Sequence, residues 1–61
     1  MDFLKFDKNM FVSMVNMKLR DEFSNVEDLC SYYDISLDDF NSKLKEFELE
    51  YYRDINQVKS V

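Results

Sequence analysis

The chain has 61 residues, a formal net charge of −5, no histidine and a single cysteine, Cys30. This length fits one domain, residues 1–61, which hides only about 60% of the surface that its unfolded chain would expose. One cysteine cannot form a disulfide within the chain, and without histidine a cysteine–histidine zinc site is excluded. Because 46% of the residues are hydrophobic, we expect a globular domain stabilised by well-packed helices or by self-association.

Residues 1–7 contain acids and no continuous apolar segment, so the sequence predicts neither a secretory signal nor a transit peptide. No apolar run approaches the roughly 20 residues that a membrane span requires. We therefore expect a cytoplasmic protein, in agreement with the lone cysteine. The negative charge disfavours non-specific binding to nucleic acid or to anionic lipid and leaves basic proteins as partners.

An N-terminal arm is expected at residues 1–7 and a first helix at residues 8–23. The arm should lie across the helices, because the side chains of Phe3, Leu4 and Phe6 would otherwise be left in water. Asp7 is the predicted N-cap of the helix, since its carboxylate can accept hydrogen bonds from the free N–H groups of the first turn. Arg20 is expected to pair with an acid such as Asp34.

Two hydrophobic stripes run along residues 8–23. The core-facing stripe repeats every four residues and consists of Phe11, Val15 and Leu19. The second consists of Met10, Met14 and Met17, and together the two are wider than a small core requires. Methionine is flexible and polarisable and is common on adaptable binding surfaces. We predict that these methionines bind a partner; the alternative is that the arm covers them.

Two short helices are predicted at residues 25–33 and 37–47, in the outline of a helix-turn-helix. Ser24 with Glu27 matches a capping box for the first, and Ser36 can cap the second. The inward positions in the first are Val26, Leu29, Cys30 and Tyr33, and in the second Leu37, Phe40, Leu44 and Phe47. The expected fold is mostly α, a three-helix, helix-turn-helix-like bundle.

Residues 48–60 allow two interpretations. Tyr51, Ile55 and Val58 continue the helical spacing of the preceding helix, which favours one long third helix. The alternative is a short β-hairpin, although the glycine-containing dipeptides typical of tight hairpin turns are missing.

Several short motifs resemble a family of very short bacterial proteins classed as a domain of unknown function. The motifs are Asn-Met-Lys-Leu-Arg-Asp at residues 16–21, Leu-Cys at 29–30, Tyr-Asp-Ile at 33–35, Lys-Leu at 43–44 and Asn-Gln-Val at 56–58. The similarity runs without gaps from about residue 8 to residue 58, and the family carries no assigned activity. Its members tend to have Gly-Tyr where this chain has Glu48-Leu49, so the resemblance implies a break near Phe47 followed by a hairpin.

A helix-turn-helix invites the hypothesis of DNA binding, in which the second helix enters the major groove. The candidate contacts are Asn41, Ser42 and Lys45 on that helix, with Arg53 and Lys59 in a wing. Duplex binding depends on lysine and arginine that neutralise phosphates, whereas here Asp38 and Asp39 would approach the DNA. Nucleic acid is therefore a disfavoured partner.

The sequence predicts no catalysis, cofactor, metal site or small-molecule substrate. A Cys30 nucleophile would need a thiolate and a base, and the chain has no histidine to supply one. The predicted function is that of a small acidic protein-interaction or regulatory module that forms a homodimer through the first helix. A third alternative is an inhibitor that mimics nucleic acid and blocks a basic protein.

Overall fold

Three α-helices and a C-terminal hairpin make up the structure, a computed structural model that describes residues 2–61. The helices are α1 (Lys8–Asp21), α2 (Val26–Tyr32) and α3 (Leu37–Glu46), and the strands are β1 (Leu49–Tyr52) and β2 (Gln57–Ser60). A 3-10 turn, η1 (Phe3–Lys5), precedes them. Met1, the first residue of the expected arm, lies outside the described residues. The mostly α fold with a C-terminal hairpin is confirmed, and the alternative of a long third helix is wrong.

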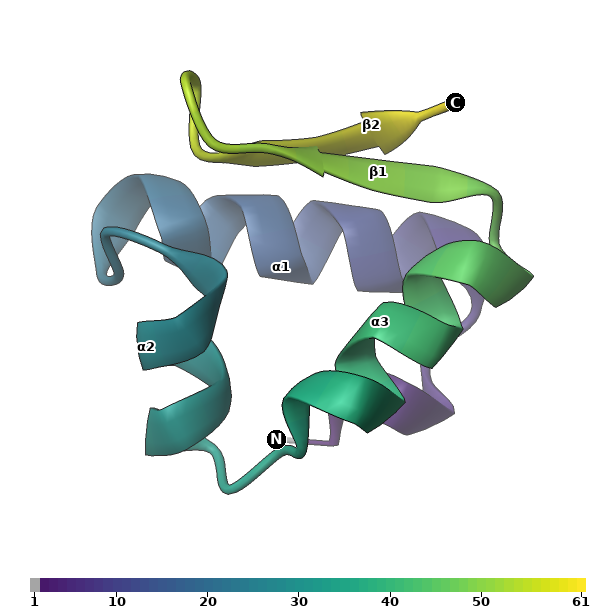
Figure 1. Ribbon diagram of the computed structural model, residues 1–61, viewed down its shortest axis with the longest axis horizontal. Helices are drawn as coiled ribbons and strands as arrows, with labels where there is room; N and C mark the ends of the chain where they lie inside the picture. Colours follow the sequence, from purple (N-terminus) through teal and green to yellow (C-terminus); the bar gives the residue numbers. More distant parts are fainter. Residues whose placement is uncertain (1) are drawn as a thin grey trace.

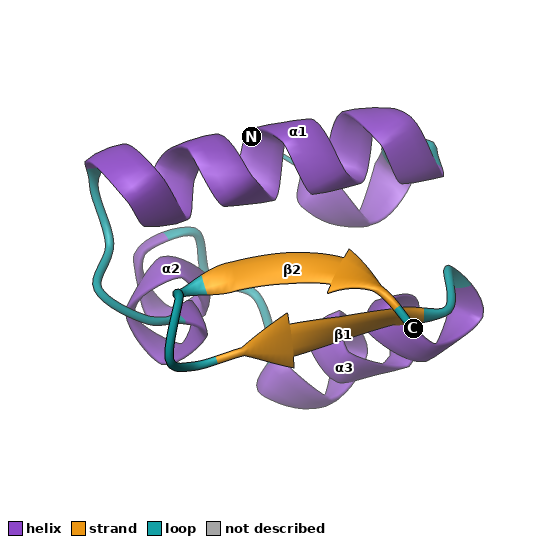
Figure 2. Cartoon of the chain, turned by 90° about the horizontal axis from the view of Figure 1, so that it is seen from above, coloured by secondary structure: helices purple, strands orange, loops and turns teal. Residues whose placement is uncertain are grey.

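The hairpin lies along α1, and in the view of Figure 1 α2 and α3 stand below that helix, α2 towards its left end and α3 towards its right end. Seen from above, β2 is the strand beside α1, while β1 lies on the side of α3 (Figure 2). The strands are antiparallel, with Leu49 opposite Ser60 and Tyr52 opposite Gln57. Within the helix-turn-helix segment, α2 contacts α1 and α3 contacts β1.

The helix caps follow the expected chemistry at two of three positions. The Asp7 carboxylate accepts from the Met10 N–H at 2.8 Å, and the Ser36 hydroxyl accepts from the Asp39 N–H at 3.4 Å. The prediction that Ser24 caps α2 is wrong, because the cap is Asn25, whose side chain accepts from the Asp28 N–H at 2.8 Å. Val26 is buried and is the first helical residue, so its neighbour Asn25 is the last extended residue and takes the cap position.

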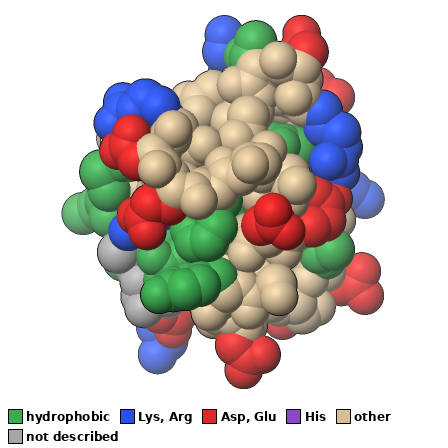
Figure 3. Space-filling model, turned by 90° about the vertical axis from the view of Figure 1, so that its left-hand side faces the viewer, with side chains coloured by type: hydrophobic (Ala, Val, Ile, Leu, Met, Phe, Trp, Pro, Cys, Tyr) green, Lys and Arg blue, Asp and Glu red, His purple; other side chains and the backbone are tan. Residues whose placement is uncertain are grey.

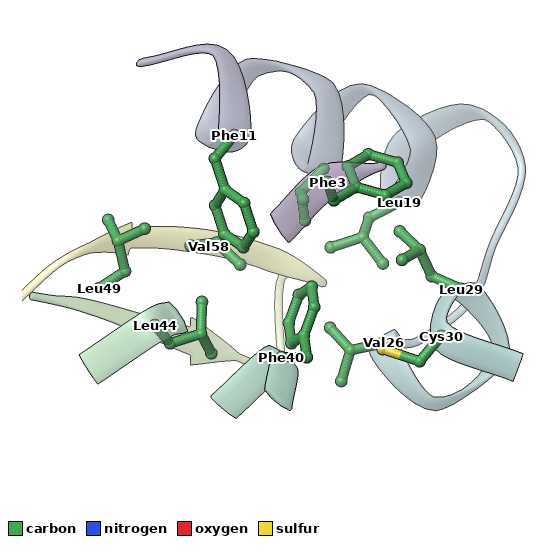
Figure 4. Packing of buried hydrophobic residues seen from close by; sticks show 11 residues of the cluster. Phe3, Phe11, Leu19, Val26, Leu29, Cys30, Phe40, Leu44, Leu49 and Val58 are labelled. Carbon is green, nitrogen blue, oxygen red and sulfur yellow. The ribbon is translucent and has the colours of Figure 1, made fainter. Parts of the chain in front are cut away.

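The core draws on every element of the chain, including the arm. Figure 4 shows these side chains pointing into one cluster from η1, the three helices and both strands. Its members are Phe3, Phe11, Val15, Leu19, Val26, Leu29, Cys30, Phe40, Leu44, Leu49 and Val58. Phe3 is fully buried, so the arm forms part of the core rather than a cover over it.

Leu37 was predicted to be buried and is 40% exposed. The inward face of α3 is set by Phe40 and Leu44, which are one turn apart and both buried. Leu37 shares this side of the helix but is the first residue of α3, one turn before Phe40, so its exposure reflects its place at the helix end. Phe47, also predicted to be inward, packs against the core while remaining partly exposed.

The third helix ends where the family resemblance placed a glycine. Glu48 has φ of 55°, in the left-handed region, and its N–H donates to the carbonyl of Lys45 at 3.1 Å. This conformation terminates the helix and turns the chain into β1. Among residues 2–61, the structure contains no helix with both the length and the apolar character that crossing a membrane would require.

Candidate functional site

A polar cluster between α1 and the hairpin accounts for two of the family-like motifs. The Asn16 side chain donates to the Val58 carbonyl at 2.9 Å and accepts from the Val58 N–H at 2.7 Å. Because β2 pairs with β1 along one edge only, the Asn16 amide takes the place of a third strand on the other edge. Gln57 donates to the Asn16 carbonyl at 3.2 Å and tightens the same contact.

Asn56 closes the end of α1 from the hairpin turn. Its backbone has φ of 53°, and its side-chain amide donates to the carbonyls of Leu19 and Phe23, both at 2.9 Å. The Tyr51 hydroxyl donates to the Asn56 side-chain oxygen at 2.6 Å, and burial raises the pKa of this tyrosine. Asn56 thus satisfies carbonyl groups that a helix C-terminus would otherwise leave free.

These asparagines and Gln57 bind the chain to itself, so their role is structural. Sequence reasoning missed the cluster, because the bonded residues lie 33 to 42 positions apart. Two signals were present in the sequence. One is Asn16, a polar residue next to the core-facing Val15, and the other is the Asn-Gln-Val motif at residues 56–58.

The structure places the three methionines on one flank of α1, facing away from the hairpin. Met10 is 50% exposed, whereas Met14 and Met17 are half-buried and Met14 packs against the core. The arm contributes Phe3 to the core and contacts both α1 and α3. It leaves Met10 uncovered, so the flank presents methionine surface to solvent.

The candidate DNA contacts are divided among α3, the hairpin turn and β2. Asn41, Ser42 and Lys45 are exposed on α3, and Lys59 is exposed on β2. Arg53, in the hairpin turn, forms two hydrogen bonds to the Glu27 carboxylate on α2. The Arg53 guanidinium lowers the pKa of Glu27, and the carboxylate in turn raises the pKa of Arg53.

A second cluster, which sequence reasoning missed, consists of three aromatic rings where α1 meets α2. Tyr32 and Tyr33 are 4.9 Å apart between ring centroids, Phe23 lies 5.4 Å from Tyr32 and 5.9 Å from Tyr33, and the contacts are edge-on or tilted. Tyr32 is nevertheless 71% exposed. The face of the molecule at the α2 side carries a hydrophobic patch with acidic side chains beside it (Figure 3).

Within the described residues, the acids outnumber the bases that could neutralise them. Five ion pairs form, among them Lys18 with Glu22 and Arg20 with Asp21. Arg20 pairs with an acid as expected, but its partner is the adjacent Asp21, at 2.9 Å, rather than Asp34. Eight acidic and three basic side chains remain outside these pairs. The described surface therefore carries an excess of acidic side chains outside ion pairs.

The Lys18 ammonium lies beside the aromatic cluster. The Glu22 carboxylate and the Tyr33 hydroxyl, as hydrogen-bond partners, raise its pKa. The Lys18 ammonium is therefore charged at neutral pH, and its partners, Glu22 and Tyr33, belong to the same chain.

Two open hollows lie on the surface. One, of about 220 Å³, lies between Leu4 of the arm and the outer face of α3. The other, of about 360 Å³, lies at the end of α1 and is lined by Phe23, Asn56, Asp21, Glu22 and their neighbours. Among residues 2–61, no three histidine, cysteine or acidic side chains come together as a metal site would need.

Cys30 lies in the core, 1% exposed. Burial raises the pKa of its thiol to about 11. The thiol is therefore protonated at neutral pH and serves packing in this position.

The sequence matches the family described as a domain of unknown function, DUF4250, over residues 5–58. The chain belongs to this family. No curated protein and no solved structure matches the chain. Within the family match lie the Asn16 cluster, the methionine flank and the three aromatic rings, so each belongs to the part of the chain that the family covers.

Proposed function

We propose that this member of the family is a cytoplasmic protein-interaction module that acts by binding rather than by catalysis, and that it pairs with a second copy of itself through the methionine flank of α1. The observation that carries the proposal is the half-exposed Met10 beside Met14 and Met17. Methionine adapts its shape to an apolar partner. A symmetric pair would bury this flank on both copies at once.

The size of the chain supports pairing. A domain of about 60 residues has a thin margin of stability, and self-association is one of the few ways to enlarge its core without a disulfide or a metal. An antiparallel arrangement of two α1 helices also sets the helix dipoles in opposite directions. Such an interface is small, so we expect a weak, concentration-dependent dimer.

DNA binding is the weaker hypothesis. Arg53, the arginine expected in the wing, is held by Glu27. Acids in the first turn of α3, Asp38 and Asp39, stand where a groove-reading helix would meet phosphates.

Light scattering across a dilution series tests self-association. We expect the mass of a dimer at high concentration and that of a monomer on dilution, and Met10→Glu should remove the dimer, because a carboxylate would be buried in the interface. Leu37→Glu is the matched control, since Leu37 is an exposed hydrophobic residue on α3. A monomer at every concentration, or equal effects of the two variants, contradicts the proposal.

A further inference from the structure

Tyr32 presents an aromatic ring to solvent. The ring is 71% exposed and is supported from the side by an edge-on contact with Tyr33 and a tilted contact with Phe23. A tyrosine held in place from the side loses little conformational entropy on binding, and such residues are enriched where partners bind most strongly. The cluster therefore has the features of a binding surface.

Carboxylates flank this ring. Asp28 lies one turn before Tyr32 on α2, so the two side chains share a face of the helix. Asp28 is exposed and forms no ion pair with any other residue in the range 2–61. Asp34, also exposed and outside those pairs, follows at the end of α2. On the other side, Phe23 borders the hollow whose wall contains Asp21 and Glu22.

An exposed aromatic face beside a free carboxylate is the arrangement that recognises arginine. The guanidinium group is planar, stacks on aromatic rings and donates two parallel hydrogen bonds to one carboxylate. An ammonium group can make only a point contact with the same pair. We propose that the Tyr32 surface, formed by Phe23, Asp28, Tyr32 and Tyr33, binds an arginine side chain in a basic segment of a partner protein.

Charge favours a basic segment of a partner protein over a nucleic acid or a second copy of this chain as the ligand of the Tyr32 surface. The chain carries a net charge of −5, so a basic segment is attracted and the phosphates of a nucleic acid are repelled. A second copy of the chain would bring only Arg20 and Arg53, and each is already paired, with Asp21 and Glu27. The proposal is independent of self-association, because the Tyr32 surface and the methionine flank are different surfaces.

The test is an NMR titration of the intact chain with an acetylated, amidated peptide of repeated Gly-Arg-Ser, alongside the same peptide with lysine in place of arginine. We expect shifts centred on α2 and Phe23, and tighter binding of the arginine peptide. Tyr32→Ser should weaken binding by about two- to fivefold, as expected for the loss of a cation–π contact at an exposed site. Tyr52→Ser, at an exposed tyrosine of the hairpin, is its control.

A second matched pair separates the specific contact from net charge. Asp28→Asn and Asp38→Asn remove the same charge from the first turn of α2 and α3. We expect a clear loss of affinity only for Asp28→Asn. Equal effects of this pair, equal affinity for the two peptides, no binding, or preferred binding of a DNA duplex titrated in parallel would each overturn the proposal.

Self-association through the methionine flank and arginine binding at the Tyr32 surface can be tested separately. Met10→Glu should bind the arginine peptide as the unchanged chain does, even if it no longer forms a dimer. Loss of peptide binding in this variant would move the binding site to α1 and contradict the assignment to Tyr32.

Discussion

Single residues decide where this chain turns. Three non-glycine residues have left-handed backbone, Asp34 with φ of 57°, Glu48 with 55° and Asn56 with 53°. Asparagine and aspartate tolerate this region because their short side chains can bond locally, and the Asn56 amide bonds to the end of α1. Glu48 has no such relief: its Cβ is crowded against the backbone, which costs about 1 kcal/mol.

Replacing Glu48 by glycine should therefore stabilise the protein. Glycine adopts positive φ without a steric cost, so we expect Glu48→Gly to raise the free energy of unfolding by about 1 kcal/mol, even though glycine also makes the unfolded chain more flexible. Urea denaturation followed by circular dichroism measures the change. Glu50→Gly, in the middle of β1, is the control and should destabilise by about 0.5 to 1 kcal/mol. If Glu48→Gly is destabilising as well, Glu48 is not strained.

Much of the structure at the scale of single residues could be predicted from local chemistry. Asp7 and Ser36 were identified as caps from residue type and position, because a cap acts on N–H groups within one turn. The choice between Ser24 and Asn25 could not be made in the same way. Both residues can cap, and the burial of Val26, a tertiary fact, fixes which of them does.

At the level of elements, the hairpin depends on α1 more than on its own turn. An isolated two-stranded hairpin is marginal in water. Here Asn16 bonds to both backbone groups of Val58, and Val58 itself is 1% exposed. Helical spacing favoured a continued helix for residues 48–60, and only the resemblance to the family favoured the hairpin. The bonds that hold it join residues 42 positions apart, which no local pattern reveals.

Asn16→Ala should weaken this docking strongly. The substitution leaves the N–H and the carbonyl of Val58 without partners in a part-buried site, and each such group costs about 1 to 3 kcal/mol. We expect a loss of about 2 to 4 kcal/mol in the free energy of unfolding, a large share of the total for a chain of this size. Asn9→Ala, at an exposed asparagine of α1, should change it by less than about 0.5 kcal/mol. Similar losses in the two variants would contradict a docking role for Asn16.

The candidate surfaces differ in how far the sequence predicts them. The methionine flank follows from helical periodicity, since residues three and four positions apart share a face. The Tyr32 surface requires Phe23, beyond the end of α1, to meet two rings of α2. Periodicity within either helix contains no information on that contact. The arm shows the same limit, because Phe3 was expected to lie over the helices and instead packs against Tyr33 inside the core.

For the molecule as a whole, one core joins the arm, the helices and both strands. A core shared in this way leaves no element with an independent set of buried contacts. We therefore expect two-state unfolding, in which α2 opens only when the whole molecule does. Cys30, buried on α2 and reaching this core, can report that event.

The Cys30 thiol should react with a disulfide reagent only through global unfolding. Its pKa of about 11 in the folded protein keeps it protonated at pH 7, and burial blocks access. Because this pKa is raised above the ordinary 9.0, folding favours the protonated thiol; the resulting stability is complete below pH 9 and is lost as the pH rises towards 11. Labelling at pH 7 therefore avoids this loss.

When reclosing of the opened protein is faster than labelling, the labelling rate of Cys30 should follow the equilibrium between folded and open molecules. Asn16→Ala, which acts on the hairpin far from Cys30 in sequence, should then accelerate labelling about tenfold for every 1.4 kcal/mol that it removes from the unfolding free energy. Fast labelling in the unchanged chain, with no further acceleration in Asn16→Ala, would mean that α2 opens by itself.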